Sequence, residues 1–92
     1  GYASRKKNDF QAAIADYSKA IELNSKHFKA FFNRGFLYDK LGDFEKAIQD
    51  YTAALEIDPS NAFTYYNRGI SYDRVGNYQA AIENFNKAVE LE

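Results

Sequence analysis

The apolar positions of this chain recur at spacings of three and four residues, which is the pattern of an amphipathic helix. In the segment 44–57 they are Phe44, Ala47, Ile48, Tyr51, Ala54 and Leu55. Glycine or asparagine interrupts the pattern at regular intervals, so we expect helices separated by short turns. The predicted helices span residues 1–7, 10–23, 28–41, 44–57, 62–75 and 78–91.

Two kinds of connection alternate between these helices. Gly42 and Gly76 can adopt the left-handed conformation at a helix end, and each precedes an Asp or Asn that can cap the next helix. Asn8 occupies the corresponding place near the N-terminus, where we expect it to make the same turn. The longer connections are 24–27 and 58–61, and the second contains a proline, which cannot continue a helix.

The whole pattern repeats with a period of 34 residues. Positions in register include Gly1, Gly35 and Gly69, then Phe10, Phe44 and Tyr78, and then Ala13, Ala47 and Ala81. A fixed period of this size is typical of proteins in which consecutive helix pairs stack on one another. The repeated glycines and alanines are expected where helices cross closely, with aromatic rings filling the remaining space.

The order of residues in each unit resembles the tetratricopeptide repeat, and Asp58-Pro59 closes the middle unit where that family usually has its proline. The resemblance covers essentially the whole chain. It implies an all-α fold, a right-handed α-solenoid of stacked antiparallel helix pairs. It also implies a single domain over residues 1–92, made of a truncated first repeat (1–27), a second repeat (28–61) and a third repeat (62–92). Because the chain starts inside a repeat, we expect it to be an excerpt of a longer protein.

Composition narrows the possible functions. The 12 Lys and Arg residues nearly balance the 13 Asp and Glu residues, so the chain lacks the overall positive field that would hold a phosphate backbone. It has no cysteine for a disulfide or a thiolate metal site. No apolar run approaches the roughly 20 residues that span a bilayer. We therefore expect no nucleic-acid partner and no membrane insertion. The absence of cysteine does not define the cellular compartment, for which the cytoplasm is the favoured expectation.

Residues suited to catalysis are scarce. His27 is the only histidine, lies in a connection and has neither a cysteine nor an obvious paired carboxylate beside it. The chain shows no glycine-rich phosphate loop and no cluster of metal ligands. The sequence therefore predicts a domain that is not an enzyme and needs no cofactor or metal.

The resemblance places a binding site on the first helix of each repeat, which lines the concave face in this family. Asn33 and Asn67 form a row one repeat apart, and an asparagine offers a donor and an acceptor to the backbone of an extended peptide. Nearby apolar residues are expected to contact the side chains of that ligand. The predicted peptide-binding residues are Asn33, Asn67, Phe32, Tyr66, Phe36, Ile70 and Lys29. The adjoining Arg34 and Arg68 are expected to reach solvent or an acidic neighbour.

Other interpretations of these positions stay open. An asparagine on a helix face also tolerates solvent without any ligand, and some of the aromatic rings must pack between repeats. One branch of the family clamps the C-terminal carboxylate of chaperones, but here Phe63 and Asn67 replace the Lys and Arg of that clamp.

Two functions from different classes follow. The first is a protein-protein interaction module, a scaffold or adaptor that binds an extended peptide in the concave groove. The second is a structural segment that forms homo-oligomers through exposed terminal helices, because Phe85 and Val89 have no following helix to cover them.

Overall fold

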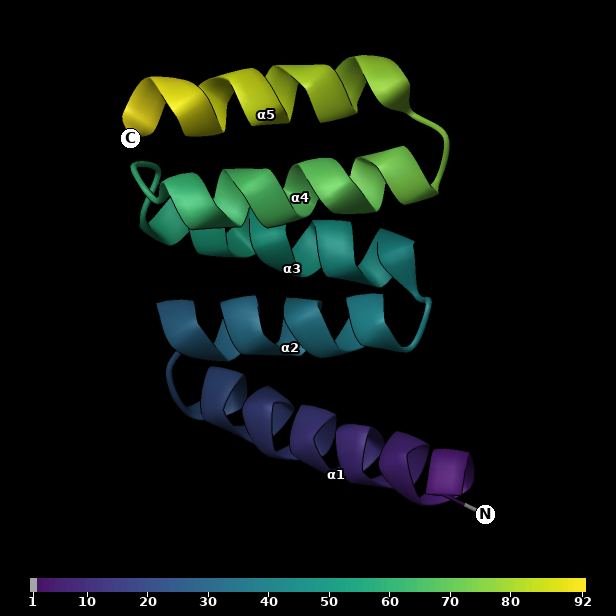
Figure 1. The fold of residues 1–92 in the computed structure, drawn as a ribbon. Coiled ribbons are helices and arrows are strands. Elements are labelled where there is room, and N and C mark those ends of the chain that lie inside the picture. The colour runs from purple at the N-terminus through teal and green to yellow at the C-terminus, as the bar shows by residue number, and fades with distance from the viewer. Residues whose placement is uncertain (1) are drawn as a thin grey trace.

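A computed structural model of the chain describes the backbone of residues 2–92 and the side chains of residues 8–92. This part of the chain forms five α-helices and no strand: α1 (Tyr2–Leu23), α2 (Phe28–Lys40), α3 (Phe44–Ile57), α4 (Ala62–Arg74) and α5 (Tyr78–Leu91). Consecutive helices run antiparallel and stack in one direction, so the two termini lie at opposite ends of the stack (Figure 1). Each helix packs on the next, and α2 also contacts α4. The predicted all-α solenoid is confirmed.

The first helix differs from the prediction. α1 continues from Tyr2 to Leu23, so the expected separate helices 1–7 and 10–23, with a turn at Asn8, are wrong. The glycines that occupy this place in the later repeats have positive φ, a conformation that costs asparagine more than glycine. A helix that continues through Asn8 keeps its backbone hydrogen bonds, whereas a separate helix of seven residues would be too short to be stable alone.

The two later tight turns form as predicted. Gly42 and Gly76 have φ angles of 83° and 84°. Each glycine amide donates to the carbonyl three residues earlier at 3.0 Å, and the next amide donates to the carbonyl five residues earlier at 2.9 Å. Asn77 then caps α5 through its side chain, but Asp43 makes no such bond to α3. Its carboxylate instead lies 3.7 Å from the Nζ of Lys46.

Small residues bring the two helices of a repeat together, as predicted. A Cβ atom on Gly35 would lie 3.1 Å from the Cβ of Asp50, and one on Gly69 would lie 2.7 Å from Cε1 of Phe85. Phe85, expected to be uncovered at the end of the stack, is therefore half-buried because its ring packs on α4. The buried apolar core consists of Ala30, Ala47, Tyr51, Ala54, Leu55, Ala81 and Ala88.

Candidate functional site

All seven predicted peptide-binding residues lie on α2 or α4, the first helices of the second and third repeats. A depression of about 360 Å³ between these helices brings three of the seven together. It is lined by Phe28, Lys29, Phe32, Asn33, Asn61 and Phe63, and is called the aromatic depression below. Tyr66, Asn67 and Ile70 lie further along α4, and Phe36 lies further along α2.

Phe32 is both part of the aromatic depression and a packing residue. Its ring centroid lies 5.6 Å from that of Tyr51 on α3 and 5.6 Å from that of Phe63 on α4. The ring of Phe28 stacks on it at 6.1 Å. Phe32 is therefore half-buried and joins three helices, so a change at this residue affects folding as well as any ligand.

The apolar residues that were predicted to contact a ligand do not form a continuous exposed strip. Phe36 is 38% exposed and Tyr66 is 50% exposed, but Phe32 and Ile70 are half-buried. The most exposed ring on this face is Phe63, at 61%. A ligand would thus meet separate rings flanked by polar groups, which is the usual arrangement at interface anchors.

The two asparagines of the predicted row differ. The side chain of Asn33 is half-buried and makes no hydrogen bond to any residue that the structure describes. The Nδ2 of Asn67 donates to the carbonyl of Phe63 in its own helix at 2.9 Å. Asn61, the cap of α4, accepts from the amide and the hydroxyl of Thr64 at 2.8 Å each. Asn33 therefore offers a donor and an acceptor, whereas Nδ2 of Asn67 already gives one hydrogen bond to its own helix.

Polar contacts fix the far end of this face. The Oγ of Ser71, which is fully buried in α4, donates to the carboxylate of Asp39 in α2 at 3.1 Å. The Nζ of Lys40 lies 5.0 Å from the ring centroid of Phe36, within the range of a cation-π contact. Lys29 is exposed at the other end of the face, on the rim of the aromatic depression. Cations therefore lie at both ends of α2.

Three residues that line the aromatic depression were not among the seven predicted peptide-binding residues. They are Phe28, Asn61 and Phe63. The repeat period gave a signal for Phe63, because it lies 34 residues after Lys29 and so occupies the same position of its repeat. Asn61 could not be found in this way, since it precedes the helix and its capping role gave no indication of a site.

A network of polar contacts surrounds Arg34, on the side of α2 that faces away from the aromatic depression. The Nε and Nη2 of Arg34 donate to the two carboxylate oxygens of Asp50 at 2.8 and 2.7 Å, and Nη1 donates to the Oγ of Ser18 at 3.0 Å. The hydrogen bonds to Asp50 and its negative charge raise the pKa of Arg34, against the opposing effect of burial. The acidic neighbour expected for this arginine is thus Asp50, and one side chain ties α1, α2 and α3 together.

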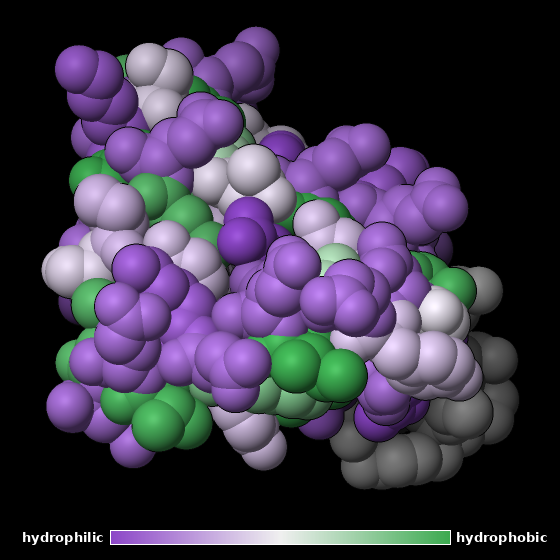
Figure 2. Space-filling view, turned by 90° about the horizontal axis from the view of Figure 1, so that it is seen from above, coloured by the Kyte–Doolittle hydropathy of each residue, from purple (hydrophilic) through white to green (hydrophobic). Residues whose placement is uncertain are grey.

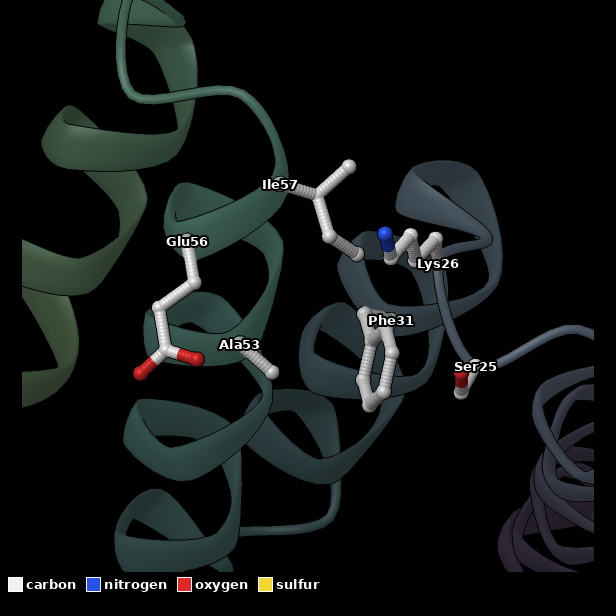
Figure 3. A pocket seen from close by; sticks show the side chains of 6 residues that line it. All are labelled: Ser25, Lys26, Phe31, Ala53, Glu56 and Ile57. Carbon is white, nitrogen blue, oxygen red and sulfur yellow. The ribbon is translucent and has the colours of Figure 1, made fainter.

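Another depression, of about 460 Å³, lies between the start of α2 and the end of α3. Figure 3 shows the residues that line it: Ser25, Lys26, Phe31, Ala53, Glu56 and Ile57. None of the predicted peptide-binding residues is among them. Its rim carries one cation and one anion, so it shows no preference for a ligand of either charge.

His27 has a structural role. Its Nδ1 accepts a hydrogen bond from the amide of Ala30 at 3.2 Å and so caps the N-terminus of α2. Among the described residues, no group of His, Cys, Asp or Glu side chains could hold a metal ion. No helix in the described part of the chain is both long and apolar enough to cross a membrane.

Family models identify the fold independently. The tetratricopeptide repeat model matches residues 28–61 and 62–92, and a second TPR repeat model matches residues 1–42. The chain therefore belongs to the tetratricopeptide repeat family, whose members are protein-interaction modules. No curated protein is significantly similar in sequence.

Solved structures of MamA resemble the chain closely. One crystal structure of MamA has a TM-score of 0.88 and 33% identity over 99% of this chain and 53% of its own. A second has a TM-score of 0.88 and 34% identity over 100% and 50%. A mutant form of MamA has a TM-score of 0.80 and 32% identity over 83% and 56%. The chain thus spans about half the length of these proteins.

Proposed function

We propose that this domain is a scaffold or adaptor module that binds an extended peptide along the face formed by α2 and α4. One observation carries the proposal: the aromatic depression lies beside Asn33, whose side chain makes no hydrogen bond to the described residues. The depression accepts an apolar side chain, and the amide of Asn33 pairs with the peptide backbone.

Rigidity of the two helices supports the proposal. Phe32 holds α2 against α3 and α4, and the Ser71–Asp39 bond holds α2 against α4 a few turns away. A binding surface that is fixed before the ligand arrives loses less conformational entropy on association. The cations Lys29 and Lys40 favour ligands with acidic residues near either end of the bound segment.

Selection from a displayed peptide library tests this function. We expect the selected peptides to contain an apolar anchor, and Phe63→Ala to weaken their binding because Phe63 is an exposed wall of the depression. Tyr78→Ala is the matched control, since Tyr78 is 63% exposed on α5 and lies outside the depression. Equal loss in both variants, or no selected peptide at all, would contradict groove binding.

Self-association is the second candidate function. The α5 end of the stack carries exposed apolar residues, with Tyr78 63%, Ile82 55% and Val89 71% exposed. Figure 2, which views this end from above, shows apolar atoms in separate patches among polar ones. Association through this end must weaken on dilution and with Ile82→Lys/Val89→Lys, as light scattering would detect. A particle mass that stays that of a monomer at every concentration would exclude this function.

A further inference from the structure

The guanidinium of Arg68 has no carboxylate partner among the side chains that the structure describes. Its Nε donates to the Oδ1 of Asn84 at 2.7 Å, and its Nη1 donates to the Oγ1 of Thr52 at 3.1 Å. Both acceptors are neutral, so neither balances the charge of the guanidinium. Nη2 makes no hydrogen bond to the described residues, and since no buried polar side-chain atom among them lacks a partner, Nη2 reaches solvent.

In the preceding repeat, the equivalent arginine is paired with a negatively charged side chain. Arg34 lies one period before Arg68, and its Nε and Nη2 both bind the carboxylate of Asp50. Ser18 accepts from Arg34 as Thr52 accepts from Arg68. The two sites therefore differ chiefly in the replacement of an aspartate at 50 by an asparagine at 84.

The rings of two tyrosines lie beside the guanidinium of Arg68, which has no carboxylate partner among the described residues. The Cζ of Arg68 lies 5.5 Å from the ring centroid of Tyr65 and 5.9 Å from that of Tyr72. Successive residues of an α-helix are rotated by roughly 100°, so this stripe lies on the side of α4 opposite to Tyr66 and Asn67. The guanidinium is thus held in place by α3 and α5, flanked by rings, and turned away from the proposed peptide groove.

From these contacts we propose that the guanidinium of Arg68 is a binding site for an oxyanion, either a carboxylate or a phosphate group. An oxygen of the anion accepts a charge-assisted hydrogen bond from Nη2 and supplies the negative charge that Asp50 supplies to Arg34. Arginine suits this chemistry because its guanidinium is planar, always charged and less strongly hydrated than an ammonium group. The site is independent of whether the opposite face binds a peptide.

Titration with inorganic phosphate, followed by NMR at constant ionic strength, tests the site. We expect a saturable shift of the Nε–H resonance of Arg68 and of the side-chain amide of Asn84, with no comparable shift at Arg34. A parallel titration with acetate shows whether a carboxylate is also accepted, and sodium chloride at the same ionic strength is the control. Absence of a saturable shift with both phosphate and acetate would overturn the proposal.

Two substitutions exchange the residue types that face the two equivalent arginines. Asn84→Asp gives Arg68 the carboxylate that Arg34 already has, so phosphate affinity should fall about tenfold or more. Asp50→Asn removes that carboxylate from Arg34 and should create a second saturable site there. Unchanged phosphate affinity in Asn84→Asp, or a folded Asp50→Asn variant without a new site, would contradict the inference.

Discussion

A Cβ atom at Gly69 would lie only 2.7 Å from Cε1 of Phe85, closer than two non-bonded carbon atoms can approach. The equivalent atom at Gly35 would meet its nearest neighbours at 3.1 Å, so these neighbours would have to move by only a few tenths of an ångström. Both glycines permit a close helix crossing, because each Cβ would also lie 3.2 Å from a backbone carbonyl oxygen of the next helix, but only at Gly69 does an aromatic ring fill the space that the Cβ would need.

Gly69→Ala should therefore lower the free energy of unfolding by about 1–3 kcal/mol, because Phe85 must move out of the crossing. Gly35→Ala should cost less. Urea unfolding followed by circular dichroism measures both changes. Asp73→Ala, an exposed change in the same helix, is the control and should stay within about 0.5 kcal/mol of the parent. A Gly69→Ala variant that unfolds with the parent would refute this packing role.

Asp50→Ala should destabilise the fold by about 1–3 kcal/mol, because it leaves the half-buried Arg34 without its two charge-assisted hydrogen bonds. The larger values known for fully buried ion pairs do not apply, since the Arg34 side chain is 20% exposed. The double variant Arg34→Leu/Asp50→Ala should be less damaging than the sum of the single changes. A double-mutant cycle in urea measures the coupling, and strict additivity would contradict the pairing.

Burial raises the pKa of Tyr51 above its usual range, and the negative charges of Asp39 and Asp50 raise it further. Since the neutral phenol is favoured in the folded state, its contribution to stability is complete below about pH 10 and is lost as the pH rises through the folded pKa. Unfolding free energies measured from pH 8 upward should therefore stay level up to about pH 10 and decline above it, and the decline should be smaller in Tyr51→Phe. The exposed Tyr78→Phe provides the control, and equal pH slopes in both variants would contradict the assignment.

The continuous α1 also gives a test. Asn8 is exposed in the middle of this helix, so Asn8→Ala should leave stability unchanged or raise it by a few tenths of a kcal/mol, because alanine has the higher helix propensity. If Asn8 formed a left-handed turn instead, alanine would be strained there and the variant would lose stability. Thermal unfolding followed by circular dichroism distinguishes the two cases.

The 34-residue period made the fold predictable, because alanine and glycine at repeated positions determine where helices cross, as Gly35 and Gly69 show. The same reasoning failed at Asn8, where matching the position to Gly42 ignored the cost of positive φ for asparagine. For the site, the period located the correct helices. It did not predict that Phe32 packs between helices or that Asn67 bonds to its own helix, because these contacts depend on tertiary geometry.

Arg34 and Arg68 illustrate a further limit. Their partners lie 16 residues before and after them, on two different helices, so neither local spacing nor the helical period revealed these contacts. The difference between Asp50 and Asn84 was visible in the sequence, but it acquired a meaning only when the structure placed both residues against an arginine.

The row of asparagines predicts unequal effects on peptide binding. Asn33→Ala should cost about 0.5–1.5 kcal/mol, a typical net contribution of one hydrogen bond. Asn67→Ala should cost less, because the Nδ2 of Asn67 already donates to the carbonyl of Phe63. Both variants should unfold close to the parent, since neither side chain supports another helix in the structure.

Titration of a selected peptide into the double variant Asn33→Ala/Asn67→Ala tests the central claim most directly. NMR shift mapping must first show that this peptide lies along α2 and α4. We predict that the double variant then binds this peptide more weakly than the parent, by at least the loss of binding free energy caused by Asn33→Ala alone. The Tyr78→Ala variant should bind the peptide with the affinity of the parent. Unchanged affinity in the double variant, for a peptide mapped to this face, would contradict backbone recognition by the asparagines.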